Sequence, residues 1–261
     1  MKRTYVKLLT VAGLTGCFLF TSCRSAQETT ARYEISKVEG NMITIDSTWD
    51  ANPDKKATTV LKPYKDKVDA MMYEVIGTSE MKMDKGTPES LLSNLVASVL
   101  QEAAAQVLGK PADMGLVNMG GLRNILPKGD ITVGAVFEIL PFENSLCVLT
   151  MKGTDMKRLF KAIASLHGEG VSGIRLEINK KGELLNATIG GKPVVDDQLY
   201  TVATIDYLAD GNGRMDAFLQ AEKRECPEDA TLRGLFLDYV RKPTAEGKII
   251  TSKLDGRITV K

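Results

Sequence analysis

The hydrophobic pattern of this 261-residue chain changes its period at Gly109. Before this glycine, apolar residues recur every three or four positions, which is typical of amphipathic helices. One helix is expected over residues 61–77, with its methionines filling the core. A second is expected over residues 87–109, with Thr87 as N-cap and Pro88 in the first turn.

After Gly109 the apolar residues form short runs joined by glycine-bearing turns, a pattern that indicates β-strands. Two further amphipathic helices are expected among them, one over residues 153–168 and one bounded by Pro227 and Pro243. Strands that alternate with single helices predict an α+β fold in which helices cover layers of sheet. The expected strands lie within residues 114–120, 145–153, 173–191, 198–206 and 248–261.

Residues 1–22 have the composition of an export signal. A basic start is followed by an apolar run at residues 8–20, which is too short to span a bilayer as a helix. Cys23 follows Thr and Ser and precedes a polar stretch, so we interpret it as the lipidated first residue of a bacterial lipoprotein. Lipidation at Cys17 and a plain secretory signal are the alternatives. The chain is therefore expected to be exported and lipid-anchored in the cell envelope, on the periplasmic side or the surface.

Residues 23–58 are expected to form a polar tether that contains two strands within residues 33–46. The signal holds three of the 34 Lys and Arg residues, so the remaining chain has fewer bases than its 33 Asp and Glu residues. This balance argues against nucleic acid as a partner, because such proteins usually carry a basic patch. It also gives no polybasic attraction to a membrane, so attachment would depend on acyl chains.

Two cysteines, Cys147 and Cys226, lie within the expected fold. Cys147 stands in a strand-like apolar run, and we interpret it as a small buried hydrophobic residue. A disulfide between the two in an oxidising compartment is the less favoured alternative.

The chain has few residues suited to breaking bonds. Its single histidine, His167, ends an expected helix, where an imidazole suits the negative helix end. No cluster of His and acidic residues has the spacing of a two-metal site, and no nucleophile elbow or phosphate-binding glycine loop is present. Residues 210–216 resemble a calcium loop, but Arg214 and Ala221 stand where ligands are needed. We therefore expect no cofactor in this chain and a binding fold rather than a self-sufficient enzyme.

The middle of the chain has features suited to a polar ligand that contains a ring. Gly120 and Gly121 allow a backbone to approach a ligand closely. Arg123 offers a fork of donors for phosphate or sugar oxygens. Phe142 is placed to stack on a base, with Tyr207 as the opposite plate, and a core position for Phe142 is the alternative.

Three motifs in order resemble the C-terminal, substrate-specificity domain of the 5'-nucleotidase family. They are NMGGLR from residue 118, PFEN from residue 141 and ATIDYLADGNG from residue 203. The resemblance covers residues 59–261 and implies a multilayer α/β/β/α fold that binds nucleotides. The family's metallophosphoesterase domain is missing from this chain, so divalent metals are expected only on a partner.

The resemblance also implies roles for single residues. Phe142 and Tyr207 would sandwich the nucleobase, and Arg123 would contact the phosphate or ribose oxygens. Asn118 and Asn144 would form hydrogen bonds with the base.

The sequence departs from the family pattern at two places. The segment at residues 83–90 offers only Lys85 where relatives have arginines, which predicts weaker affinity for phosphate. Gly213 stands where the family has the acid that binds the ribose hydroxyls, with Asp210 and Asp216 as candidate substitutes.

Three functions fit these observations. The favoured hypothesis is the specificity half of a split 5'-nucleotidase, with a separate metallophosphoesterase protein as partner. The second is a lipid-anchored protein that binds nucleosides or nucleotides without catalysis. The third is a scaffold domain that has lost its ligand.

Overall fold

The computed structural model describes residues 34–261. The chain divides into two units, and their boundary in the sequence lies between Pro53 and Asp54. The predicted lipidation site Cys23 lies outside the described residues. In the first unit, residues 34–45 form no regular structure, and a short helix follows as η1 (Ser47–Ala51). The prediction of two strands within residues 33–46 is therefore wrong. Two short strands without a third strand or a covering helix are marginal in water, and Ile35 and Ile45 are exposed.

The second unit begins with α2 (Lys55–Met72), which confirms the first predicted helix with shifted ends. Met71 is 62% exposed, so the expectation that the methionines fill the core is wrong for this residue, whereas Met72 is partly buried and packs against the core. The helical spacing correctly indicated an apolar face. It did not indicate what that face packs against, because periodicity carries no information about a partner.

The predicted helix over residues 87–109 is present but begins later, as α3 (Leu91–Ala103) and α4 (Ala105–Leu108). Ser90 is the N-cap in place of Thr87, because the preceding Glu89 is drawn into a tertiary contact. Its carboxylate accepts hydrogen bonds from the backbone N–H groups of Asp255 and Arg257, both at 3.0 Å. The span from Leu91 to Leu108 is long and apolar enough to cross a membrane by length and composition, but half of it is buried in the domain as a core helix.

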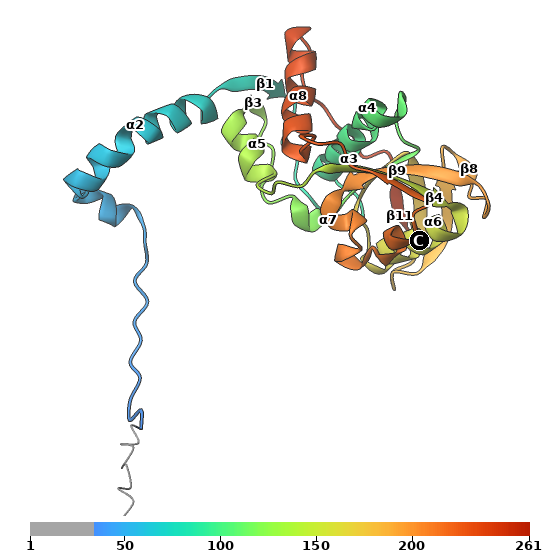
Figure 1. Ribbon diagram of the computed structural model, residues 1–261, viewed down its shortest axis with the longest axis horizontal. Helices are drawn as coiled ribbons and strands as arrows, with labels where there is room; N and C mark the ends of the chain where they lie inside the picture. Colours follow the sequence, from blue (N-terminus) through green and yellow to red (C-terminus); the bar gives the residue numbers. More distant parts are fainter. Residues whose placement is uncertain (1–33) are drawn as a thin grey trace, which may run out of the picture. The chain divides into compact units, whose positions relative to one another are not determined.

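A five-stranded sheet forms the centre of the second unit, in the order β10-β4-β9-β2-β5 (Figure 1). Strands β2 and β9 are parallel, and the other neighbours are antiparallel. Helix α3 packs on β2, β5 and β9 through a fully buried apolar face. The bounds are β2 (Met114–Val117), β4 (Leu146–Lys152), β5 (Gly170–Ser172), β9 (Leu199–Ile205) and β10 (Lys223–Glu225).

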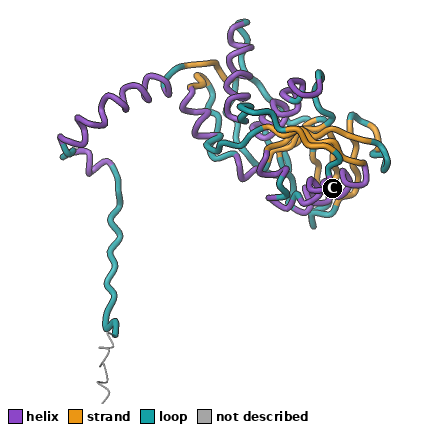
Figure 2. The backbone as a smooth tube through the Cα atoms, in the orientation of Figure 1, coloured by secondary structure: helices purple, strands orange, loops and turns teal. Residues whose placement is uncertain are grey.

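A four-stranded sheet in the order β11-β6-β7-β8 adds a second layer. Helix α6 (Gly153–Ser165) contacts strands of both sheets, and its buried face includes Leu159 and Phe160. The predicted α+β class with several sheet layers is confirmed, and Figure 2 shows the strands gathered with helices around them. The strands are β6 (Ile174–Ile178), β7 (Leu184–Ile189), β8 (Lys192–Pro193) and β11 (Ile258–Val260).

A smaller layer closes the other side of the unit. Strands β1 (Val75–Ser79) and β3 (Gly129–Thr132) pair antiparallel, and α5 (Val133–Ile139) follows β3 directly. Helix α8 (Leu232–Ala245) packs on β1, α3 and α5. Pro243 does not end this helix as predicted but lies within its last turns. The short helical segments are α7 (Asp206–Ala209), η2 (Met119–Gly121), η3 (Asn212–Arg214) and η4 (Asp216–Gln220).

Cys147 and Cys226 form a disulfide, with their Cα atoms 4.2 Å apart. The preference for Cys147 as an unpaired buried residue is therefore wrong. Strand β10 pairs with β4 so that Glu225 lies opposite Val148, which places the next residue beside Cys147. The two cysteines are 79 residues apart in sequence, so only this strand register shows that they meet.

Candidate functional site

The residues predicted from the sequence to bind a ligand lie at one end of the five-stranded sheet. Asn118 follows the end of β2, and Tyr207 lies in the first turn of α7, which follows the end of β9. Because β4 runs antiparallel to β9, with Leu146 opposite Ile205, its first residues lie at this same end. The loop before β4 carries Phe142 and Asn144, so strand direction alone brings four distant side chains together.

A cavity of about 320 Å³ opens at this end of the sheet. Phe142 and Tyr207 both line it and are 48% and 44% exposed, so each ring keeps a free surface. The alternative core position for Phe142 is not observed. No lining side chain is charged, and the full lining is Asn118, Gly120, Gly121, Phe142, Asn144 and Tyr207.

The glycine turn, at Gly120 and Gly121, forms one wall of the cavity, and a lysine is hydrogen-bonded to the backbone of this turn. The Nζ atom of Lys85 donates to the carbonyl oxygen of Leu122 and, at 3.4 Å, to that of Met119. A Cβ atom on Gly121 would lie only 3.1 Å from Oδ1 of Asn118, so the turn leaves little room for a side chain. Lys85 therefore holds the turn in place and is not among the cavity-lining residues.

Asn118 has an unusual hydrogen-bonding state. Its Oδ1 atom is buried and has no hydrogen-bond partner among the described residues. Most buried polar atoms in folded proteins are paired, and leaving one unpaired typically costs about 1–3 kcal/mol. A small adjustment of this side chain toward a ligand in the cavity would supply the missing bond.

Arg123 lies beside the cavity but not in its lining. Its side chain is exposed, and NH1 donates to the carbonyl oxygen of Gly120 at 3.3 Å. The guanidinium is therefore placed at the rim, next to a lining glycine. It can meet a charged group that projects from a ring bound in the cavity.

Neither candidate for the missing ribose-binding acid lines the cavity. Asp210 forms an ion pair with Arg224 at 2.6 Å, and Asp216 begins η4. Gly213 itself lies close to the Tyr207 ring, since a Cβ atom there would be 3.8 Å from Cε1 of the tyrosine. The cavity thus has uncharged walls where the family pattern has an acid.

Glu169 is a residue that sequence reasoning missed. It precedes β5, whose Gly170 pairs with Val117, so its carboxylate reaches the glycine turn and accepts a hydrogen bond from the Met119 N–H. Burial raises the pKa of Glu169 from 4.5 to about 7, while the Met119 hydrogen bond acts in the opposite direction. No motif in the sequence signals this contact, because it depends on the pairing of β5 with β2.

The described residues contain no group of three or more His, Cys, Asp or Glu side chains arranged to hold a metal ion. His167 follows α6 with a left-handed backbone (φ 62°) and is exposed. The donor set that a two-metal hydrolase needs is therefore not found within residues 34–261.

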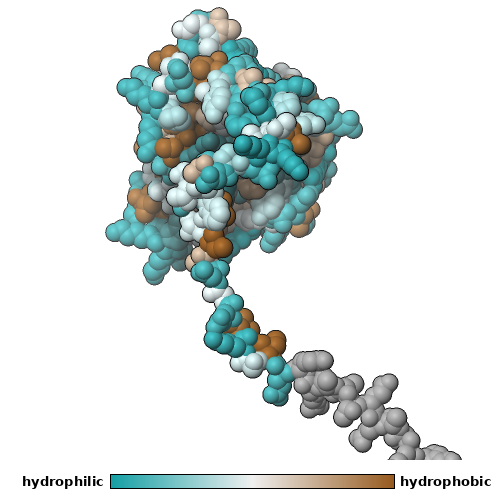
Figure 3. Space-filling view, turned by 90° about the vertical axis from the view of Figure 1, so that its left-hand side faces the viewer, coloured by the Kyte–Doolittle hydropathy of each residue, from teal (hydrophilic) through white to brown (hydrophobic). Residues whose placement is uncertain are grey.

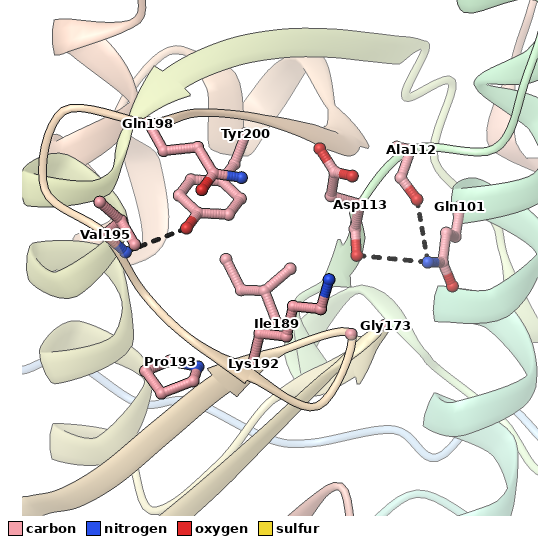
Figure 4. A pocket seen from close by; sticks show the side chains of 11 residues that line it. Gln101, Ala112, Asp113, Gly173, Ile189, Lys192, Pro193, Val195, Gln198 and Tyr200 are labelled. Carbon is pink, nitrogen blue, oxygen red and sulfur yellow. Dashed lines mark hydrogen bonds between the residues drawn. The ribbon is translucent and has the colours of Figure 1, made fainter.

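A larger cavity of about 690 Å³ lies at the opposite end of the sheet, where β9 begins (Figure 4). Its polar groups mainly fasten loops to one another. The Gln101 amide donates to the carbonyl oxygens of Ala112 and Asp113, and the Val195 N–H donates to the Tyr200 hydroxyl oxygen. It shares no lining residue with the candidate site and includes none of the residues selected from the sequence.

Comparison with known proteins assigns this fold to a family. Residues 75–220 match the model described as "5'-nucleotidase, C-terminal domain". The chain is 28% identical over 188 residues to the endonuclease YhcR of Bacillus subtilis, covering 69% of this chain and 15% of that protein. It is 27% identical over 240 residues to the cell wall protein Lmo0130 of Listeria monocytogenes, covering 81% of this chain and 30% of the relative.

Among solved structures, the chain resembles the 5'-nucleotidase precursor of Thermus thermophilus with a TM-score of 0.67 and 26% identity. The match covers 81% of this chain and 44% of that structure. The chain thus spans less than half the length of each of these relatives. The resemblance found in the sequence motifs is confirmed, and the chain belongs to the family of 5'-nucleotidase C-terminal domains.

Proposed function

We propose that this protein binds a nucleoside or nucleotide with its base between Phe142 and Tyr207. The observation that carries the proposal is the cavity itself, in which two half-exposed aromatic rings and two asparagines converge from three strand ends. A base stacked on an aromatic ring gains about 1–3 kcal/mol, and asparagine amides offer both donors and acceptors for its edge.

The uncharged lining indicates that the ring contributes most of the affinity. A phosphate would extend to the rim, where Arg123 can offer charge-assisted hydrogen bonds. With Lys85 bonded to backbone carbonyl groups, this rim arginine carries the selectivity for nucleotide over nucleoside.

We further propose that the domain is the specificity half of a split 5'-nucleotidase. A separate metallophosphoesterase would supply the metal ions and the hydrolysis, while this chain would orient the substrate. An exported, lipid-anchored protein of the cell envelope would meet extracytoplasmic nucleotides. One named relative is a cell wall protein, which supports this location.

A competing function is binding of a neutral ring without catalysis. The uncharged cavity lining favours it, because a base or nucleoside makes full use of these walls. The two functions differ in whether the phosphate adds affinity and in whether a metallophosphoesterase gains activity from this protein.

Calorimetry with nucleosides and their monophosphates tests the pocket. Phe142→Ala and Tyr207→Ala should each weaken binding by about 1–3 kcal/mol, whereas Phe142→Tyr should bind almost normally. Arg123→Ala should weaken the nucleotide more than the matching nucleoside. Tyr73→Ala is the control, because this exposed tyrosine lies outside the cavity. Absence of binding at millimolar ligand would favour the scaffold hypothesis.

A phosphate-release assay tests the split enzyme. This chain is mixed with a metallophosphoesterase protein that has no specificity domain, and nucleoside monophosphates are offered as substrates. We expect turnover that depends on Phe142 and Arg123 and that a chelator abolishes. Metal-dependent turnover by this chain alone would contradict the split arrangement.

A further inference from the structure

Helix α2 presents an apolar stripe that no other part of residues 34–261 covers. Val60, Leu61, Tyr64, Val68 and Met71 are between 50% and 69% exposed and recur at three- and four-residue spacing. The helix touches the rest of its unit near its C-terminal end, where it contacts α5. The face shown in Figure 3 is otherwise mainly hydrophilic, with apolar side chains in small separate patches.

On its own this helix would be weakly stable. It buries no residue, and short helices in water depend on packing of their apolar face. Pro63 lies in its interior, where the missing N–H removes one helical hydrogen bond. An 18-residue helix with these two weaknesses needs a surface that covers its apolar stripe.

The charges around the stripe indicate the chemistry of that surface. Each residue turns an α-helix by about 100°, which places Lys65 and Lys67 at the two edges of the stripe. Asp66 lies on the opposite face, and Asp69 lies beyond Lys65, farther from the stripe. The helix holds five lysines and two aspartates, so its local charge is +3 although the whole chain is near neutral.

Two ion pairs neutralise part of this charge. Lys62 pairs with Asp66, and Lys65 with Asp69, both along the helix surface. The other three lysines have no acidic group within 4 Å among the described residues; they are Lys55, Lys56 and Lys67. Their charge remains available to an external anionic group.

We propose that α2 lies on an anionic lipid surface, with its stripe in the boundary between headgroups and acyl chains. An apolar face edged by lysines, with low net hydrophobicity, is the pattern of interfacial helices. Each lysine near an anionic surface contributes about 1 kcal/mol. Pairing with a second copy of α2 is disfavoured, because Lys65 and Lys67 at both edges would face like charges.

This contact gives the proposed lipid anchor a second attachment. A single acyl chain binds a membrane only marginally, and a basic amphipathic segment can supply the additional affinity. The inference rests on α2 alone, so it stands whether or not Cys23 carries a lipid. It is also independent of the proposed ligand cavity.

Vesicle sedimentation with residues 34–261 tests the proposal. This fragment is expected to fold, because the buried core of the described chain lies between Ile76 and Ile258. We expect binding to vesicles of phosphatidylglycerol and phosphatidylcholine that exceeds binding to pure phosphatidylcholine by about tenfold and weakens at high salt.

Variants on two faces of the helix locate the contact. Leu61→Glu, and separately the pair Lys56→Glu with Lys67→Glu, which replaces two lysines that have no ion pair among the described residues, should each lower vesicle binding about tenfold or more. Thr59→Glu is the matched control, because it adds the same charge on the face away from the stripe and should lower binding far less. Thermal unfolding should be unchanged in all of them, since every substituted side chain is exposed.

Three results would overturn the proposal. One is equal binding to neutral and anionic vesicles, or none to either. Another is a loss of binding that Thr59→Glu produces as strongly as Leu61→Glu. The third is a lipid-free dimer that Leu61→Glu dissociates, or a protein partner whose binding requires the stripe. Nucleotide calorimetry on the same variants should be unaffected, so this result is separable from the fate of the pocket.

Discussion

Glu169 gives a prediction in which the structure supplies both sign and magnitude. Burial raises the pKa of this carboxyl group from 4.5 to about 7, so the folded protein holds a proton that the unfolded chain has released between those pH values. Protonated Glu169 therefore contributes its full share of the free energy of unfolding below about pH 4.5, and this contribution is lost as the pH rises through about 7. A difference of two to three pH units corresponds to about 3 kcal/mol.

Replacing Glu169 by Gln removes this titration. The Gln side-chain oxygen can still accept the Met119 hydrogen bond, so the glycine turn is kept. We expect Glu169→Gln to match the wild type at pH 4.5 and to be more stable at pH 8 by up to about 3 kcal/mol.

Urea unfolding of both proteins at half-unit steps from pH 4 to 8.5 measures the difference. Each curve is followed by circular dichroism and fitted with a common m-value. Glu183→Gln is the control, because this exposed glutamate makes its hydrogen bonds at the surface. A difference between wild type and Glu169→Gln that stays constant with pH, or that grows toward acid, would refute the argument that burial dominates.

Three further predictions concern other parts of the chain. The disulfide between Cys147 and Cys226 closes a loop with a sequence separation of 79, so its reduction should lower the free energy of unfolding by up to about 4 kcal/mol. Urea unfolding curves that coincide with and without reductant would contradict this. Lys85→Met should weaken the affinity for a nucleoside, measured by calorimetry, about tenfold, because the glycine turn loses its two charge-assisted hydrogen bonds. Unchanged affinity would show that the conformation of the turn does not depend on Lys85. Cys23→Ser should abolish acyl labelling and release the protein from membranes in cells. Labelling that survives Cys23→Ser but is lost in Cys17→Ser would instead assign the lipidation site to Cys17.

The residues that the short motifs singled out lie together at one end of the central sheet. Four of the five residues assigned by resemblance line one cavity, and the fifth, Arg123, lies at its rim. The glycines were chosen for backbone freedom, which is a local property that sequence states directly. Lys85 was named from the sequence for its charge toward phosphate, whereas its bonds to the backbone of the turn depend on packing between segments more than 30 residues apart.

Hydrophobic period and turn residues predicted the kind and order of most elements, because these signals act over a few neighbours. They placed α3, α6 and the strands β2, β4 and β9 within a few residues, but they did not predict β5 and β10 of the same sheet. Which faces are covered became visible only in the folded domain. The apolar stripe of α2 is exposed, the partly buried Glu169 accepts a hydrogen bond from the glycine turn, and Cys226 meets Cys147. These outcomes follow from strand register and long-range packing, and a local pattern contains no information about what lies opposite it.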